Sequence, residues 1–390
     1  MESNRTMRFV FVGDLMFNRE FLLPPNDDRE PEYYFSGVRD LFHRADIAFC
    51  NLESTLLREG SPLRPRTGFQ LHSPPDKMIP ILEYLNINVI SLGNNHMDDF
   101  GAESLLGTKR LLIDNGFSPF GVGETPEDAR KPMIVNKYGT RIAFLGYTTN
   151  TAGDGISPDI GSAIATVDAP GCNYYAIEDI RKDISSVKEE VDILCVSLHW
   201  GYEYFHYPSP RQVELAHRII ESGADIIIGH HPHCLQGIEH YREGVILYSI
   251  GNFFFFNYYK RIGHPLYGND FIIAICEVTS EGITVDFIPG EMDKGNSLHL
   301  LQKRDEFDRL LAEYSGRLND LDYSTFWQQY KEETEDFLQN IALEHASTII
   351  RSPADIPAIL RKIKEQGFSR ALERLKYKLR AKSRLEEKRK

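Results

Sequence analysis

Residues 226–233 read IIIGHHPH, an apolar run that ends in three imidazoles. The run has the length and composition of a buried strand, and the histidines follow where that strand would end. Three imidazoles within four residues are hard to explain by packing, and Pro232 would stiffen the loop that carries them. Because neutral imidazole is a common metal ligand, we predict a metal site that includes His230, His231 and His233.

Four further apolar runs end in polar motifs of the same kind. They are Gly13-Asp14, Asn51-Leu52-Glu53, Asn94-Asn95-His96 and His199-Trp200-Gly201. In open α/β proteins, ligands bind beyond the carboxyl ends of the strands. The five motifs are therefore expected to meet at one rim of the folded domain.

A regular alternation of strand-like and helix-like segments extends from residue 8 to about residue 230. It predicts an α/β fold with βαβ units and a largely parallel sheet. The turn at 136–140 indicates one hairpin in that sheet, and the segments 270–279 and 283–289 indicate a second hairpin that closes the domain. The expected strands are 8–13, 46–51, 88–92, 132–136, 141–147, 191–198, 224–229 and 245–250, and the expected helices are 36–44, 75–86, 101–115, 175–189 and 210–222.

Three parts of the chain differ in their pattern. After Pro289, strand-like and helix-like segments no longer alternate. The apolar residues there have helical spacing without a strand signal, and Pro353 marks a break in that helical stretch. We predict a domain over 1–295, an all-helical extension over 296–350 and a basic amphipathic tail over 351–390.

The charge of the chain is unevenly distributed. The net charge is −13, but residues 361–390 carry +9, so that the remaining residues carry −22. Such an acidic body is a poor nucleic-acid binder, because phosphate contacts need clustered Lys and Arg. One hypothesis is that the tail contacts an anionic membrane face or an acidic partner. The alternative is a solvated helix that packs on the rest of the chain, and the charge of the tail alone does not decide between the two hypotheses.

The cysteines and the N-terminal residues bear on the cellular compartment. Cys50, Cys195 and Cys276 lie in strand-like runs, so we expect buried thiols rather than disulfides or zinc ligands. No apolar run reaches the length of about 18 residues that a membrane span needs, and the first residues lack the apolar stretch of a signal peptide. The expected location is the cytoplasm, with peripheral contact to the inner face of the membrane if the tail binds it.

The residue types at the strand ends are those of a divalent metal site. Asp14, Glu53, Asn95 and His199 offer oxygen and nitrogen ligands without a thiolate, which suits Mn²⁺, Zn²⁺ or Fe. Each of them alone could be a helix cap, a turn residue or a core histidine, so the prediction depends on their coincidence. Two ions about 3.5–4 Å apart would activate water and stabilise charge on a transferring phosphoryl group, and His96 could protonate the leaving oxygen.

Four more residues are candidates for contact with a substrate. Glu203 could act as an acid or base, and Trp200 could stack on a ligand, although either could be purely structural. Asn252 follows another apolar run and Gly251, and its amide could bond a substrate or a ligand. Arg66 lies in a proline-rich segment and could bind an anionic group, or this segment could only cover the sheet.

In their order along the chain, these motifs resemble those of the CapA/PgsA family of capsule, or poly-γ-glutamate, biosynthesis proteins. The resemblance covers residues 7–290 approximately and includes the segment Ser249–Phe253 at the end of another strand. The family is related to calcineurin-like metallophosphatases. The resemblance therefore implies two facing β-sheets flanked by helices, in four layers α/β/β/α.

The resemblance also implies roles for single residues. The metal ligands that it implies are Asn95, His199, His231 and His233, and the general acid is His96. The chain departs from the metallophosphatase pattern at two positions. Met16 stands where the Asp-x-His motif that begins at Asp14 has its imidazole, and Glu53 stands where the bridging carboxylate is an Asp.

Two functions of different class are consistent with these features. The first is a metal-dependent hydrolase with two divalent ions, which acts on an anionic polymer or a phosphoester in cell-envelope polymer metabolism. The second is a non-catalytic accessory protein of capsule synthesis or export, which binds the polymer or a synthase partner. A sugar- or amide-processing hydrolase that uses the same site is a third hypothesis.

Overall fold

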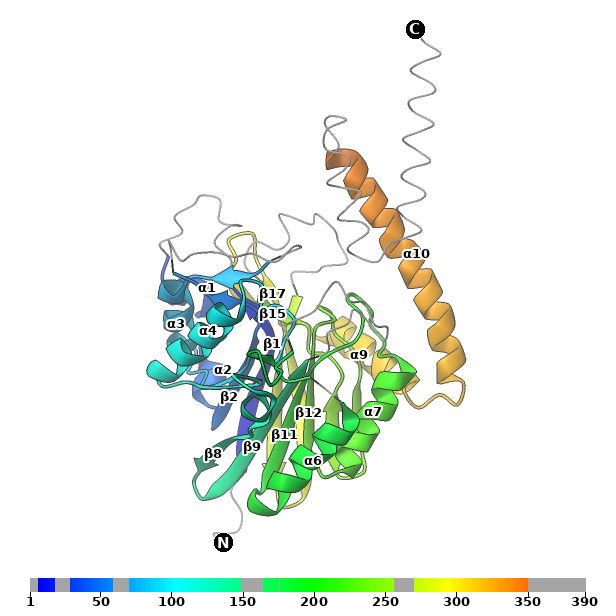
Figure 1. The fold of residues 1–390 in the computed structure, drawn as a ribbon. Coiled ribbons are helices and arrows are strands. Elements are labelled where there is room, and N and C mark those ends of the chain that lie inside the picture. Colours follow the sequence, from blue (N-terminus) through cyan, green and yellow to red (C-terminus); the bar gives the residue numbers. More distant parts are fainter. Residues whose placement is uncertain are drawn as a thin grey trace. The chain divides into compact units, whose positions relative to one another are not determined.

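The structure of the chain is a computed structural model, drawn in Figure 1. It divides into two compact units, Met1–Leu321 and Asp322–Lys390, and the second unit holds the helix α10 (Tyr323–Ile349). No helix of the described residues is long and apolar enough to cross a membrane. The described residues are 6–17, 29–58, 70–148, 164–174, 176–255 and 270–349, so the tail predicted from residue 351 onward lies outside them.

The first sheet has β1 at its centre. Its order is β18-β17-β16-β1-β2-β5-β6, and β15 pairs with the end of β1. The strands β1, β2, β5, β6 and β15 run parallel, whereas β16 to β18 continue the sheet in antiparallel fashion. The bounds are β1 (Met7–Met16), β2 (Ile47–Leu52), β5 (Val89–Ser91), β6 (Ser118–Phe120), β15 (Asn252–Phe255), β16 (Asp270–Thr279), β17 (Gly282–Met292) and β18 (Leu298–Leu300).

The second sheet is mixed and has the order β13-β14-β12-β11-β9-β8. Its four central strands are parallel, and β8 and β13 pair antiparallel at the two edges. The predicted hairpin joins β8 to β9 through Tyr138 and Gly139, which have left-handed φ values of 53° and 85°. The bounds are β8 (Met133–Lys137), β9 (Thr140–Thr148), β11 (Ile193–His199), β12 (Ile226–His230), β13 (Ile238–Tyr241) and β14 (Gly244–Leu247).

Helices cover the outer faces of both sheets (Figure 1). The first sheet packs against α1 (Pro31–Phe35), α2 (Arg39–His43), α3 (Pro75–Tyr84) and α4 (Ala102–Asp114), and the second sheet lies behind α6 (Ile177–Val187) and α7 (Pro210–Glu221). The short elements are α5 (Pro126–Arg130), the 3-10 helix η2 (Lys188–Glu190) and the strand pairs β3 (Thr55–Leu56) with β4 (His72–Ser73) and β7 (Val122–Gly123) with β10 (Gly171–Cys172).

A hydrophobic core between the two sheets joins them face to face. Phe11 and Phe49 from the first sheet meet Phe144 and Ile228 from the second, and the rings of Phe49 and Phe144 stack 6.2 Å apart. Because both faces of each sheet are covered, β2 and β11 are buried at every position, which explains their continuous apolar runs in the sequence. The predicted four-layer α/β/β/α fold is confirmed.

The segment after Pro289 differs from its prediction as a purely helical extension. Leu298–Leu300 forms β18, which pairs with β17 at the edge of the first sheet. The helix α9 (Asp305–Arg317) lies in the first unit, because Ser315 accepts the backbone N–H of Ile238 and so caps the edge strand β13. A strand of three residues is too short to show a period of two, so no pattern in the sequence indicated it.

The close approach of β1 to the turn before β15 yields a stability prediction. A Cβ at Gly13 would collide with the carbonyl oxygen of Gly251. We therefore expect Gly13→Ala to lower the free energy of unfolding by about 1–3 kcal/mol, the cost of an overpacked core, in urea denaturation. The control is Gly107→Ala, an exposed position of α4 with open space around it, which should stabilise the protein by about 0.5–1 kcal/mol. Equal effects of the two substitutions would contradict this explanation.

Candidate metal centre

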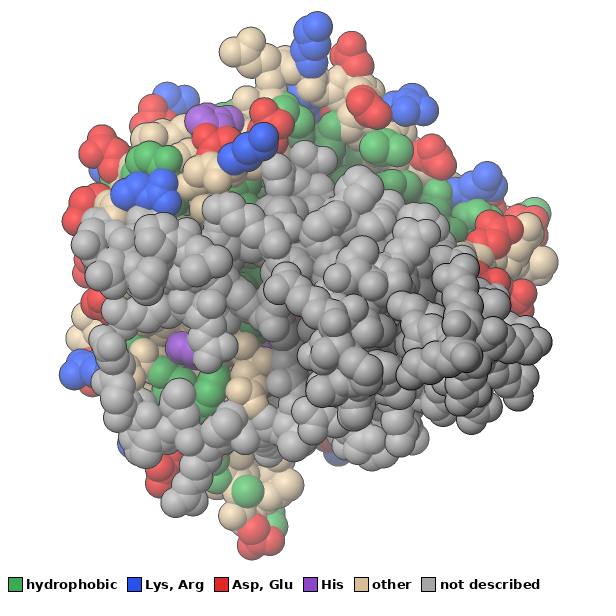
Figure 2. Space-filling view, turned by 90° about the horizontal axis from the view of Figure 1, so that it is seen from above, with side chains coloured by type: hydrophobic (Ala, Val, Ile, Leu, Met, Phe, Trp, Pro, Cys, Tyr) green, Lys and Arg blue, Asp and Glu red, His purple; other side chains and the backbone are tan. Residues whose placement is uncertain are grey.

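The polar motifs meet at the carboxyl ends of the central strands. Asp14 lies beside Asn51 and Asn252 across the ladders of the first sheet, and His199 lies beside His230 in the second. Figure 2 views this end of the sheets from above, and a histidine is visible there beside hydrophobic side chains. The structure thus brings the motifs to one rim, as the sequence indicated.

Glu53, His199 and His231 form a first ligand set, in which one potential ligand atom from each side chain lies within 4.8 Å of the others. Nε2 of His199 lies 3.6 Å from Oε1 of Glu53 and 2.7 Å from Oδ1 of Asn95. The amide oxygen of Asn95 therefore points to the same space as the carboxylate and the imidazoles. Two imidazoles, a carboxylate and an amide oxygen are suitable ligands for a divalent cation.

Asp14, Glu53 and His233 form a second ligand set, also with ligand atoms within 4.8 Å of one another. Nδ1 of His233 lies 3.5 Å from Oδ2 of Asp14, and its Nε2 lies 3.9 Å from Oε1 of Glu53. Glu53 belongs to both sets, so its carboxylate is shared by the two groups of candidate ligands.

Three amides hold the ligand side chains in place. Asn51 donates from Nδ2 to Oδ1 of Asp14 at 2.8 Å, and its own Oδ1 accepts a hydrogen bond from Nδ2 of Asn94 at 3.2 Å. Oδ1 of Asn252 lies 2.8 Å from Nδ1 of His233. Partners of this kind fix the orientation of metal ligands. The support from Asn51 and Asn94 was not predicted, although both residues belong to the motifs at the strand ends.

His96 lies at the edge of the two ligand sets. Its Nδ1 is 2.8 Å from Oδ2 of Asp99, which also accepts the backbone N–H of Leu71, and its Nε2 is 3.8 Å from Oε1 of Glu53. Burial alone would lower the pKa of His96, but the charge and the hydrogen bond of Asp99 outweigh burial and raise this pKa. The arrangement gives an oriented imidazole that can hold a proton beside the ligand sets.

The loop after β12 has an unusual backbone. His231 and His233 have φ values of 94° and 56°, in the left-handed region that residues other than glycine seldom adopt. Such conformations cost about 1–3 kcal/mol each and cluster at functional sites. They turn both imidazoles toward the ligand sets.

Burial favours the uncharged forms of both the carboxyl and the imidazole groups of the site. Burial raises the pKa of Glu53 well above its usual value, and the charge of Asp14 adds to this effect. Burial also lowers the pKa of His231 to about 4 and holds the pKa of His199 well below its usual value. His199 and His231 are therefore neutral near pH 7, and neutral imidazole is the form that binds metal.

The buried polar atoms provide a test of whether these residues fit a metal. Both carboxylate oxygens of Glu53 and both ring nitrogens of His231 are buried without a hydrogen-bond partner among the described residues. Unpaired buried groups of this kind are rare in native proteins and need an explanation. Divalent cations in the two ligand sets would give a partner to the carboxylate of Glu53 and to one ring nitrogen of His231, so the donor set fits the predicted cofactor.

Three predicted site residues are not members of the two ligand sets. His230 points between the sheets, where its ring stacks on Phe49 and its Nδ1 lies 3.5 Å from Oδ1 of Asp14, so it is beneath the ligand sets rather than in one of them. Trp200 is fully buried, and its indole N–H donates to the carbonyl oxygen of Tyr248, which argues against a contact with substrate. Arg66 lies outside the described residues.

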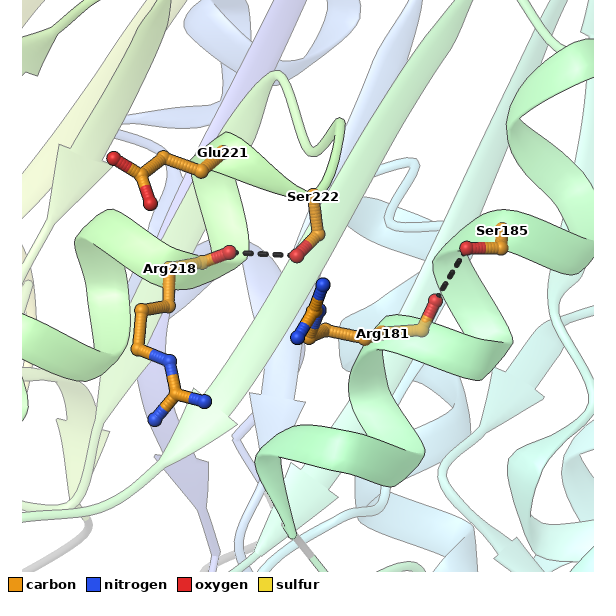
Figure 3. Close-up of a pocket in the computed structure, with 5 residues that line it drawn as sticks. All are labelled: Arg181, Ser185, Arg218, Glu221 and Ser222. Atoms are coloured by element: carbon orange, nitrogen blue, oxygen red, sulfur yellow. Dashed lines mark hydrogen bonds between the residues drawn. The ribbon is translucent and has the colours of Figure 1, made fainter.

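A hollow lies on the outer surface between α6 and α7 (Figure 3). The guanidinium groups of Arg181 and Arg218 each lie near the exposed carboxylate of Glu178, at 3.7 and 3.2 Å. The hydroxyls of Ser185 and Ser222 donate to backbone carbonyls one turn earlier. These side chains form a paired surface network of the kind that contributes little energy, and they offer no group aimed at a ligand.

Together, the fold and the site define a four-layer α/β protein with a candidate divalent-metal centre at the ends of its strands. Residues 8–257 match the model of the bacterial capsule synthesis protein family PGA_cap, and the chain belongs to this family. The resemblance to the CapA/PgsA family is thereby confirmed.

Two relatives and one solved structure show how far the similarity extends. The capsule biosynthesis protein CapA of Bacillus anthracis is 32% identical over 258 residues, and the PGA biosynthesis protein CapA of Bacillus subtilis (strain 168) is 32% identical over 254 residues. Each alignment covers 65% of this chain but only 61% and 64% of the relatives, so the chain spans less than two thirds of their length. A 5′-nucleotidase precursor from Thermus thermophilus aligns over 80% of this chain and 58% of its own with 16% identity and a TM-score of 0.43, a likeness that carries no argument about function.

The amide of Asn51 leads to a prediction that does not depend on a metal. In Asn51→Ala, Oδ1 of Asp14 and Nδ2 of Asn94 each lose a buried hydrogen-bond partner. We expect the free energy of unfolding, measured by urea denaturation in EDTA, to fall by about 1–3 kcal/mol. The control is Asn115→Ala at the exposed end of α4, where the loss should stay within about 0.5 kcal/mol. If Asn51→Ala lowered the free energy of unfolding as little as Asn115→Ala, the role given to the amide of Asn51 would be contradicted.

Proposed function

We propose that this protein is a metal-dependent hydrolase of the metallophosphatase type that acts in capsule or poly-γ-glutamate biosynthesis. The observation that carries the proposal is the position of Glu53, a buried carboxylate shared by two ligand sets. Family membership supports the biological context, because the two relatives are named for capsule and PGA biosynthesis. The substrate would be a phosphoester or an anionic polymer, and a capsule synthase would be the partner.

The proposed cofactor is a pair of divalent ions, of Mn, Zn or Fe. The first ligand set and Asn95 would hold one ion, and the second ligand set would hold the other. Two such ions lower the pKa of water and stabilise negative charge on a phosphoryl oxygen. Asn252 would orient His233, and Asn51 would orient Asp14 for this task.

The proposed proton donor is His96. Its hydrogen bond to Asp99 fixes the ring, and the raised pKa keeps a proton available near neutral pH. In the reaction, His96 would give this proton to the oxygen of the leaving group, so that the leaving group departs as an alcohol. Glu203, predicted as an acid or base, is exposed at the mouth of the site, beside His231 and His233.

Met16 favours a second candidate function. This residue is fully buried and stands where the metallophosphatase pattern has an imidazole, which leaves the second set with Asp14, Glu53 and His233. A thioether is a poor ligand for hard divalent ions. A protein with one weak metal position could act as a non-catalytic accessory that binds the polymer or a synthase.

The metal content of single variants tests the proposal. The wild type is expected to bind two Mn²⁺ ions per chain in isothermal titration calorimetry. Asp14→Asn and His199→Ala should each remove one ion, whereas Glu53→Gln should remove both, because Glu53 is shared by the two sets. Each variant that loses an ion should also lose the hydrolysis of a generic phosphodiester.

The control for this series is Glu214→Gln, which removes an exposed carboxylate from α7. It should keep both ions and the wild-type activity. If Glu53→Gln bound as much Mn²⁺ as the wild type, the proposed metal centre would be wrong. Two ions without hydrolysis of any phosphoester would favour the accessory function.

A further experiment separates the proton donor from the metal ligands. His96→Gln should keep both Mn²⁺ ions but lower kcat by about 10²–10⁴-fold, the usual contribution of a general acid. Asp99→Asn should give a smaller loss of kcat with little change in KM, because the ring keeps its place but loses its orienting carboxylate. Loss of an ion in His96→Gln would show that this histidine is a ligand instead.

A further inference from the structure

The loop that carries Glu203 is fixed against the histidine loop by two backbone hydrogen bonds. The backbone N–H of Trp200 donates to the carbonyl oxygen of His230 at 3.0 Å, and the backbone N–H of Tyr204 donates to the carbonyl oxygen of Pro232 at 2.7 Å. Gly201 and Tyr204 have left-handed φ values of 88° and 67°, so the chain turns sharply between these two bonds. Glu203 is thus held at a defined place beside the imidazoles.

Glu203 reaches both ligand sets from the solvent side. A carboxylate oxygen of Glu203 and the ligand atoms of His231 and His233 all lie within 4.8 Å of one another. His231 belongs to the first ligand set and His233 to the second, so Glu203 spans the same two sets as Glu53. The two carboxylates differ in their access to water, because Glu53 is fully buried and Glu203 is exposed.

The electrostatic influence of Glu203 extends into the buried part of the site. Its negative charge is among the causes that raise the pKa of Glu53, after burial and Asp14, and it also opposes the effect of burial on the pKa of His231. A charge that acts on both groups lies close to the space that the cations would occupy.

We propose that Glu203 is an exchangeable carboxylate ligand, which occupies the solvent-facing side of the metal centre until the oxyanion of a substrate displaces it. This inference rests on the proposed function and adds to it a criterion for the substrate. Because Glu203 is tethered to the site, its effective concentration there is high, and a small free anion competes poorly with it. The favoured substrate is an oxyanion within a larger molecule, whose further contacts offset the displacement of Glu203.

This role differs from that of a catalytic acid or base. A general acid or base acts chiefly on kcat, and its replacement leaves the affinity for Mn²⁺ unaltered. Removal of an exchangeable ligand weakens Mn²⁺ binding and also vacates the positions for which the anion competes. The affinity of the protein for Mn²⁺ and that of the metal-loaded protein for inorganic phosphate together distinguish the two roles.

The test compares the wild type with Glu203→Gln and Glu203→Asp, and uses Glu214→Gln as the matched control on α7. Calorimetry first measures the Mn²⁺ stoichiometry, and then the binding of inorganic phosphate to the Mn²⁺-loaded proteins. We expect Glu203→Gln to keep two ions, to bind them more weakly, and to bind phosphate at least about tenfold more tightly than the wild type. Glu203→Asp, with a shorter carboxylate, should lie between them, and Glu214→Gln should behave as the wild type.

The possible results separate this inference from the proposed function. Two Mn²⁺ ions in the wild type with equal phosphate affinity in Glu203→Gln would overturn the exchangeable ligand and leave the metal centre standing. No Mn²⁺ binding by the wild type would overturn both. Tighter phosphate binding in Glu203→Gln, with Glu203→Asp between it and the wild type and Glu214→Gln unchanged, would support the inference.

Discussion

A carboxylate without exposed surface, Glu53, is the constraint on which the rest of the site depends. It lies within 4 Å of ring nitrogens of His96, His199 and His233, and its oxygens have no hydrogen-bond partner among the described residues. An uncompensated buried charge costs several kcal/mol, and a neutral carboxyl here would still leave unpaired polar atoms in the core. Bound cations would give the carboxylate and the neutral imidazoles a common partner.

The fold places the carboxylate of Glu53 at the junction of its two sheets. Asp14 and Glu53 come from the ends of β1 and β2 in the first sheet, whereas His199 and His231 follow β11 and β12 in the second. Each ligand set therefore contains residues from both sheets. Cations in these sets would join the sheets at the rim where the hydrophobic core between them ends, so metal binding would also stabilise the native fold.

Much of the fold could be predicted because its central strands are buried on both faces and read as uninterrupted apolar runs. The place of the site followed from the polar residues at the ends of those runs. The directions of single side chains did not follow from the motifs. His230 continues the alternation of Ile226 and Ile228 and points between the sheets, and only the left-handed backbone at His231 turns the next imidazole toward the ligand sets. Trp200 is likewise a core residue, because its indole finds the carbonyl oxygen of Tyr248.

The two departures from the metallophosphatase pattern that the family resemblance implies would act together on the chemistry of the second ligand set. Met16 removes one imidazole, and Glu53 replaces aspartate with a side chain that is one methylene longer and reaches both sets from the end of β2. With Glu203 on the solvent side, the second set would offer three carboxylates and the imidazole of His233. Oxygen-rich sets suit harder ions, whereas additional imidazole suits Zn²⁺. In the proposed centre, the second set would therefore favour Mn²⁺ over Zn²⁺, and the first set, with two imidazoles, would accommodate either ion.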